Sequence, residues 1–154
     1  MIKILFVCHG NICRSPMAEF VMKDMVERAG LSDQFYIYSA ATSTEEIGNG
    51  IHRGTLSVLR REGIPCTGHR AVQLTRRDYE EYDYLIGMDD WNIRNMQRIT
   101  GGDPKGKLYK LLAFANTDRE IADPWYTGNF DETYDDIKEG CGALLNKLRE
   151  EHGL

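Results

Sequence analysis

The segment Ile2–Val7 is a nearly continuous apolar run, and a helix-like stretch led by a proline follows it a few residues later. Short apolar runs of this kind are typical of strands that are buried on both faces of a parallel sheet. Pro16 suits the first turn of a helix, and Gly30 suits the end of that helix. Residues 8–15 are then confined to a tight strand-to-helix turn. This first unit of the chain favours an α/β fold.

Strand-like and helix-like segments continue to alternate after this unit. Further strands are predicted at 35–39, 82–88 and 108–112, with helices at 52–62, after the Thr75 cap, from Asp89 or Asp90 to Ile99, and from Tyr134 to Leu148. This alternation predicts an α/β fold with a single domain over residues 1–154, a doubly wound, four-stranded parallel sheet and helices on both faces. Ligands of such folds bind beyond the carboxyl ends of the strands, where the turn at residues 8–15 is expected to lie.

Composition restricts the class of protein. The 154 residues are 42% hydrophobic and carry a net charge of −5 without a block of Lys and Arg, which disfavours nucleic-acid binding. No apolar stretch reaches the length of a membrane span, and the N-terminus has no signal-peptide pattern. The four cysteines, at 8, 13, 66 and 141, fit a reducing compartment, so we expect a cytoplasmic protein. Cys8 and Cys13 lack the spacing of zinc ligands, and we expect no metal.

The turn at residues 8–15 has the residues of an anion site that contains a nucleophile. Cys8 and Arg14 are six positions apart, with a glycine and an asparagine between them and Ser15 after them. Backbone N–H groups at the start of the next helix have no helical partner and can bind an anion, aided by the helix dipole. A thiol in this field is stabilised as the thiolate. The Arg14 guanidinium can hold two phosphate oxygens, Ser15 can donate to the thiolate, and Gly10 allows left-handed backbone angles.

The stretch Cys8–Pro16, which reads CHGNICRSP, resembles the signature of the low-molecular-weight protein tyrosine phosphatases. Asp123–Tyr126, which reads DPWY, resembles the acid loop of that family. Further matches follow the family's order over nearly the whole chain, in Ser39–Ser43, Gly63–Pro65, His69–Ala71 and Met88–Asp89. The resemblance implies hydrolysis of phosphotyrosine and small aryl phosphates, without a metal or cofactor, through a phosphocysteine on Cys8. It also implies that Arg14 binds the phosphate and that Asp123 is the general acid and base.

The same resemblance implies roles for the residues around these three. The phosphate-binding loop comprises His9, Gly10, Asn11, Ile12, Cys13, Arg14 and Ser15. A supporting group that holds the loop in shape comprises Asn11, Ser15, Ser39 and His69. For Ser39 and His69, the plain alternative is a strand-end serine and a loop histidine bonded to nearby backbone. The substrate pocket comprises Ile12, Glu45, Trp125 and Tyr126, with the aromatic side chains stacking on the substrate's ring.

Some positions depart from the family's usual pattern or leave a choice open. His9 stands where the family often has an apolar residue, and Glu45 and Glu46 stand where many relatives have an aromatic residue at the pocket rim. Negative charge at the rim is expected to disfavour acidic peptides, unless the glutamates form only a solvated surface pair. Cys13 is either a redox partner that protects oxidised Cys8 as a disulfide or a buried small apolar residue.

Three other functions are alternatives to hydrolysis of phosphotyrosine. A related branch of the family acts on phosphoarginine and has a smaller, polar residue where Ile12 stands, so Ile12 favours the flat ring of phosphotyrosine. Arsenate reductases of this fold need closely spaced cysteines, which Cys66 and Cys141 do not provide. A phosphate-binding module without catalysis has no use for Cys8. The expected partners are phosphotyrosine-containing proteins, with phosphate, sulfate or vanadate as competing anions. The expected state is a monomer without nucleic-acid or membrane partners.

Overall fold

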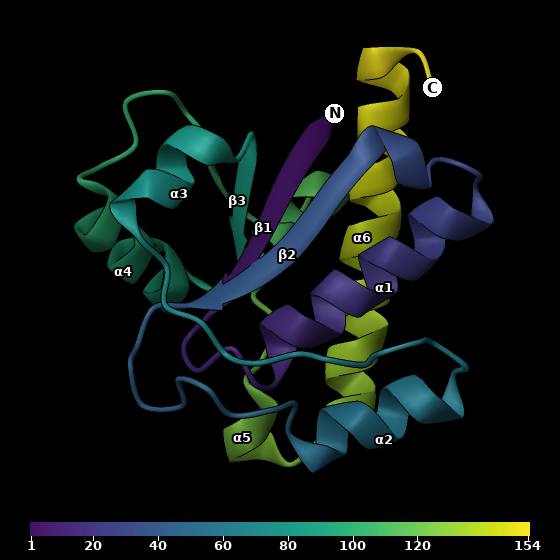
Figure 1. The fold of residues 1–154 in the computed structure, drawn as a ribbon, viewed down its shortest axis with the longest axis vertical. Helices are drawn as coiled ribbons and strands as arrows, with labels where there is room; N and C mark the ends of the chain where they lie inside the picture. The colour runs from purple at the N-terminus through teal and green to yellow at the C-terminus, as the bar shows by residue number, and fades with distance from the viewer.

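Four strands form one parallel sheet in the order β2-β1-β3-β4 in the computed structural model, which describes residues 1–154 (Figure 1). The strands are β1 (Ile2–Cys8), β2 (Phe35–Ala41), β3 (Tyr84–Gly87) and β4 (Leu108–Lys110). β1 pairs with both β2 and β3 and therefore lies inside the sheet. This position explains the apolar run that begins the sequence, because a strand inside a parallel sheet is buried on both faces.

Helices cover both faces of the sheet. They are α1 (Arg14–Arg28), α2 (Arg53–Arg61), α3 (Arg76–Glu81), α4 (Asp90–Thr100), α5 (Pro124–Thr127) and α6 (Phe130–His152), with 3₁₀ turns at Ser32–Gln34 and Leu111–Ala115. Ile4 and Phe6 of β1 share a core with α1 and α6, whereas Leu5 and Val7 share one with α3 and α4. The alternation follows from the two-residue period of a strand. The predicted single-domain α/β fold, with its doubly wound, four-stranded parallel sheet, is confirmed.

Two element boundaries near the sheet differ from the predicted ones. α1 begins at Arg14 rather than at Pro16, because the first turn of a helix has no acceptor for its N–H groups and so tolerates a proline. β3 begins at Tyr84 rather than at Tyr82, because the Tyr82 N–H donates to the Asp78 carbonyl and ends α3. Both differences reflect local hydrogen bonds that apolar periodicity does not encode.

The segment after β4 also differs from the prediction. The strand predicted at 108–112 stops at Lys110, and Leu111–Ala115 forms a 3₁₀ turn that packs on α6. Leu111 and Leu112 are both buried in the same core as α6. A strand would have sent these two side chains to opposite faces of the sheet. The turn therefore buries more apolar surface on one side than a longer strand allows.

The strands β1 and β2 end on the side of the molecule where α2 and α5 lie (Figure 1). The connection from β1 to α1 lies at this end, as expected for the ligand-binding edge of a doubly wound sheet. None of the helices combines the length and the apolar character that crossing a bilayer requires.

Candidate active site

The loop between β1 and α1 is fixed through its carbonyl groups. The carbonyls of Cys8, His9, Asn11, Ile12 and Cys13 accept hydrogen bonds from Thr42 N, Ser43 N, His69 Nε2, His52 N and Thr55 Oγ1, respectively. The N–H groups of residues 9–13 donate no hydrogen bond within the chain. These N–H groups are therefore available to an anion, next to the N-terminus of α1.

Asn11 sets the shape of this loop. Its φ angle of 58° lies in the left-handed region, and its side chain is fully buried. Its Nδ2 donates to Ser15 Oγ (2.8 Å) and to Ser39 Oγ (2.9 Å), while its Oδ1 accepts from Val72 N (3.1 Å). Gly10, which allows tight or left-handed angles, does not have a positive φ. The polar contacts of the Asn11 side chain stabilise the left-handed angle at the neighbouring position.

The sulfur of Cys8 lies inside the curve of the loop, next to Ser15. Cys8 Sγ is 3.0 Å from Ser15 Oγ and accepts from the Ser15 N–H at 3.4 Å. Since Ser15 Oγ already accepts a hydrogen bond from Asn11, its own hydrogen is free to point at the sulfur. The contacts from Asn11 through Ser15 therefore orient a donor toward Cys8.

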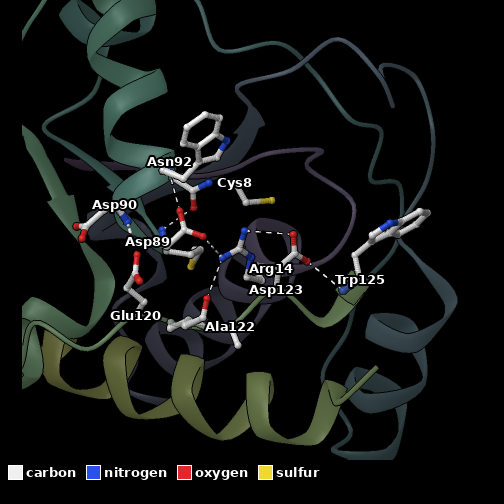
Figure 2. Close-up of polar contacts among 12 residues, drawn as sticks. Cys8, Arg14, Asp89, Asp90, Asn92, Glu120, Ala122, Asp123 and Trp125 are labelled. Carbon is white, nitrogen blue, oxygen red and sulfur yellow. Dashed lines mark hydrogen bonds and ion pairs between the residues drawn. The ribbon is translucent and has the colours of Figure 1, made fainter. Parts of the chain in front are cut away.

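Arg14 is a buried cation between two carboxylates, as Figure 2 shows. Its Nη1 donates to Asp89 Oδ2 (2.7 Å) and to the Ile121 carbonyl (2.8 Å), and its Nη2 is 3.5 Å from Asp123 Oδ2. Burial lowers the pKa of Arg14, but the neighbouring Cys8, Asp89 and Asp123 outweigh burial and raise that pKa overall. The guanidinium therefore remains charged and held in one orientation.

Asp123 reaches the site from a distant part of the sequence. Its Oδ1 accepts from the Trp125 N–H (3.0 Å) and caps the single turn of α5, which leaves Oδ2 facing Arg14 (Figure 2). The preceding residues are anchored on both sides: Ile121 N donates to the Met88 carbonyl, and Thr133 Oγ1 donates to the Ala122 carbonyl. The sequence pattern did not predict α5, whose short length and N-terminal proline obscure any helical period.

These residues surround a cavity of about 320 Å³. Its walls include the loop residues with Cys8 and Arg14, the apolar side chain of Ile12, and Asp123. Trp125 and Tyr126 line the same cavity and are 58% and 83% exposed, so most of their surface is open to a ligand. The side chains predicted to form the substrate pocket therefore line one cavity.

Part of the cavity lining is acidic. Glu45 and Glu46 both line the cavity, and His9 Nε2 lies 2.9 Å from Glu45 Oε2. Glu46 does not pair with a cation, although it accepts a hydrogen bond from Asn49. Both glutamates predicted at the pocket rim therefore line the cavity.

Cys13 also lines the cavity, but its side chain is buried. Burial, followed by the nearby charge of Cys8, raises the pKa of the Cys13 thiol to about 12. All four cysteines are free thiols. No group of three or more His, Cys, Asp or Glu side chains is arranged to hold a metal ion.

Two functional positions were not identified from the sequence. Asp89 was expected only to cap a helix, but its Oδ1 caps α4 through Asn92 N while its Oδ2 holds Arg14. Glu19 is buried on α1 and accepts from Ser39 Oγ at 2.6 Å, behind the loop. Glu19 could have been noticed as an acidic residue flanked by apolar residues in α1. The Met88–Asp89 match was the signal for Asp89.

Comparisons with known proteins agree with this geometry. A family model described as low molecular weight phosphotyrosine protein phosphatase matches residues 3–153. The Bacillus subtilis protein named low molecular weight protein-tyrosine-phosphatase YfkJ is 40% identical over 156 aligned residues, which cover 100% of both chains. The crystal structure of YfkJ matches with a TM-score of 0.95 at 41% identity, over 98% of this chain and 96% of that one.

Two further solved structures extend the comparison. SP-PTP, a low molecular weight protein tyrosine phosphatase from Streptococcus pyogenes, matches with a TM-score of 0.86 at 43% identity, over 96% of this chain and 93% of that one. DARP, a Drosophila arginine phosphatase, matches with a TM-score of 0.87 at 26% identity, over 96% of this chain and 98% of that one. The chain therefore belongs to the low molecular weight phosphotyrosine protein phosphatase family, a family of metal-independent hydrolases.

Proposed function

We propose that this protein hydrolyses phosphotyrosine in proteins through a phosphocysteine formed on Cys8. The observation that carries the proposal is the surroundings of the Cys8 sulfur. It lies beside a loop whose N–H groups are free to bind an anion, and it shares one cavity with Arg14 and Asp123. A nucleophile, an oxyanion site and a proton donor are the groups that a two-step phosphoryl transfer requires.

In the first step, the thiolate of Cys8 attacks the phosphorus atom. The S–P bond forms while the P–O bond to the tyrosine ring breaks. Arg14 and the free N–H groups stabilise the charge on the three equatorial oxygens. Asp123 acts here in its protonated form and donates its proton to the departing phenolate oxygen. The products of this step are a free tyrosine side chain and the phosphocysteine.

In the second step, the Asp123 carboxylate accepts a proton from a water molecule, whose oxygen attacks the phosphorus atom. The S–P bond breaks, and inorganic phosphate and the Cys8 thiolate are released. The Ser15 hydroxyl, 3.0 Å from the sulfur, stabilises the thiolate as it leaves. Because one step needs Cys8 ionised and Asp123 protonated, the rate is expected to follow a bell-shaped pH profile.

The cavity supports an aryl phosphate as the substrate. The apolar side chain of Ile12 and the exposed rings of Trp125 and Tyr126 offer flat surfaces on which a phenyl ring can stack. We further propose phosphotyrosine-containing proteins as partners, with phosphate, sulfate or vanadate as competing anions, and a monomeric, cytoplasmic enzyme without nucleic-acid or membrane partners.

We also propose that Cys13 protects Cys8 against irreversible oxidation. Peroxide converts a thiolate into a sulfenic acid, which a neighbouring thiol condenses into a disulfide with loss of water. Cys8 and Cys13 line the same cavity, and the charge of Cys8 is one cause of the raised pKa of Cys13. A neutral sulfenic acid on Cys8 removes that repulsion, so the oxidation itself promotes ionisation of the second thiol.

Phosphate release from a phosphotyrosine peptide and a phosphoarginine peptide, measured in the presence of a chelator, tests the main proposal. We expect release from the phosphotyrosine peptide, and its loss in Cys8→Ser. The similarity to an arginine phosphatase makes the second peptide the necessary comparison. Release mainly from phosphoarginine would retain the phosphocysteine but contradict the aryl substrate.

Absence of release from both peptides would contradict the proposal altogether. Arsenate with a thiol donor is then the next substrate to test. The structure disfavours arsenate reduction, because Cys141 is completely buried in the core on α6 and cannot act as a relay thiol.

A further inference from the structure

The ring of His52 lies between the acid loop and the start of α6. It stacks on Phe130 with a centroid distance of 5.1 Å and an interplanar angle of 17°. It meets Trp125 edge to face, with a centroid distance of 5.7 Å and an angle of 78°. Both arrangements are favourable for aromatic pairs. The three rings form a continuous stack, Phe130–His52–Trp125, that none of the proposed catalytic steps uses.

His52 is fixed from two directions before it meets these rings. Its backbone N–H donates to the Ile12 carbonyl (2.8 Å), which ties it to the phosphate-binding loop. Its Nδ1 accepts from the Gly54 N–H (3.0 Å) and caps α2. Because the backbone N–H and the ring nitrogen of His52 are both hydrogen-bonded, the ring has little freedom to rotate.

Phe130 gives the stack a rigid base. It packs against a small core of Ile12, Cys13 and Ala71 beneath the phosphate-binding loop. A side chain at position 54 would prevent this approach, because a Cβ there would lie 2.5 Å from the Phe130 ring. Gly54 therefore allows Phe130, and the stack upon it, to pack closely against α2.

Trp125 needs support of this kind. Its side chain is 58% exposed, and His52 is the one aromatic ring that it meets. Its backbone N–H is the group that Asp123 Oδ1 binds. Figure 2 shows Trp125 projecting from the acid loop on the far side of Asp123 from Arg14. A displacement of Trp125 therefore moves the hydrogen-bond donor that orients the Asp123 carboxyl group.

We propose that His52 is a positioning residue that couples the phosphate-binding loop to the acid loop. Its backbone N–H binds the Ile12 carbonyl, and its ring packs against Trp125. The phosphate-binding loop and the acid loop therefore keep a fixed separation. The inference rests on the proposed role of Asp123 as general acid. Small displacements of a catalytic group reduce rates strongly, which gives this contact a kinetic consequence.

A matched pair of substitutions separates the ring from the cap. His52→Asn keeps a favourable N-cap residue for α2 but removes the ring, whereas His52→Phe keeps a ring but removes the acceptor for Gly54 N–H. The readout is the ratio of kcat/KM for a phosphotyrosine peptide to kcat/KM for p-nitrophenyl phosphate. The tyrosine phenolate is the poorer leaving group, and p-nitrophenolate is the better one. We expect His52→Asn to lower this ratio by about 10-fold or more, and His52→Phe to retain most of the wild-type ratio. A general loss of structure would lower both substrates together and leave the ratio unchanged.

The double variant with Asp123→Ala completes the test. If His52 acts through Asp123, His52→Asn has no further effect on the ratio once Asp123 is removed. Three outcomes would overturn the inference. The first is an equal loss for both substrates in His52→Asn, and the second is a fall in the ratio in His52→Phe as large as that in His52→Asn. The third is an additive loss in the double variant. If Asp123→Ala itself left the ratio unchanged, the acid role of Asp123 would fail, and the inference about His52 with it.

Discussion

At the scale of single residues, Arg14 and Ser15 are each oriented by hydrogen bonds to a further residue. Arg14 is oriented by Asp89 and by the Ile121 carbonyl, so its Nη2 is the end left to share between Asp123 and a ligand. Asn11 in turn orients Ser15, which faces the sulfur of Cys8. Preorganised donors stabilise a transition state without having to reorganise during the reaction. These contacts therefore hold the donors of the site in place before a substrate binds.

Removal of the proposed acid should depend on the leaving group. We expect Asp123→Ala to lower turnover by roughly 10²–10⁴-fold for phosphotyrosine, whose phenolate leaves poorly, and by less for p-nitrophenyl phosphate. The cause is that only the poorer leaving group needs a proton as its bond breaks. Steady-state kinetics on a series of aryl phosphates measures this dependence. An equal loss across the series would remove Asp123 from the role of acid.

Oxidation of the site should depend on Cys13 and on pH. Only the thiolate attacks a sulfenic acid. Burial is the main cause of the raised Cys13 pKa and persists after Cys8 is oxidised, so the thiolate fraction of Cys13 at neutral pH remains small. After peroxide treatment, formation of the Cys8–Cys13 disulfide is expected to accelerate by up to about tenfold per pH unit between about pH 7 and pH 9. Mass spectrometry of samples quenched at successive times measures the rate of disulfide formation.

A thiol reductant should then restore activity in the wild type but not in Cys13→Ser. Cys66→Ser is the matched control, because Cys66 is not among the residues that line the cavity, and it should behave as the wild type does. Full recovery of activity in Cys13→Ser would show that Cys13 does not protect Cys8.

The sequence predicted the part of the site that is contiguous. Cys8, Arg14 and Ser15 lie within one turn, so their spacing alone indicates a common anion site. The contacts of Asp89 to Arg14 and of His52 to Trp125 join segments that are distant in sequence, so the spacing of residues does not indicate them. Asp89 caps α4 and also binds Arg14 of another helix. From the sequence alone, such a residue cannot be told from an ordinary helix cap.

At the scale of helices and strands, predictions held where one physical requirement dominated. β1 is buried on both faces, and its apolar run identifies it directly. β4 spans only Leu108–Lys110 at the edge of the sheet, and packing of Leu111 and Leu112 on α6 ends it early. α5 contains four residues, too few to show a helical period. Long-range packing, rather than local propensity, determines these short elements.

Two glycines of α6 offer a matched test of that packing. A Cβ at Gly140 would lie 2.5 Å from Leu111 Cγ, whereas a Cβ at Gly142 would meet no atom within 4 Å. Gly140→Ala is therefore expected to lower the free energy of unfolding by about 1–3 kcal/mol through overpacking. Gly142→Ala should raise it by about 0.5–1 kcal/mol, because alanine reduces the entropy lost when the helix forms. Urea denaturation of both variants measures the difference. Stabilisation by Gly140→Ala would contradict the close contact between α6 and Leu111, and destabilisation by Gly142→Ala would contradict the open space at that position.

At the scale of the whole molecule, the sheet separates two apolar cores and leaves its carboxyl end free for the site. Ionisable groups nevertheless lie inside these cores. Cys141 is completely buried on α6, and burial raises the pKa of its thiol from the ordinary value of 9.0. Burial, and secondarily Glu151, raises the pKa of Tyr84 to about 12. The folded protein therefore resists ionisation at groups that ionise readily in the unfolded chain.

This difference predicts that stability falls at alkaline pH. The Cys141 thiol is neutral in both states well below its ordinary pKa of 9.0, so its contribution to stability is complete there. Above that pH the unfolded chain releases the proton while the folded chain retains it, and the free energy of unfolding falls by up to about 1.4 kcal/mol per pH unit for one group. Urea denaturation at several pH values between about pH 8 and pH 10 measures this slope.

Cys141→Ala should reduce the alkaline slope, whatever its effect on stability at neutral pH. The buried thiol is then absent from both states, so it no longer releases a proton on unfolding. Cys66→Ala is the control, since Cys66 is only partly buried and should change the slope less. Tyr84, which is partly buried, contributes mainly at higher pH, where its side chain ionises in the unfolded chain. A slope in Cys141→Ala equal to that of the wild type would mean that the thiol ionises equally in the folded and unfolded states, contrary to its complete burial.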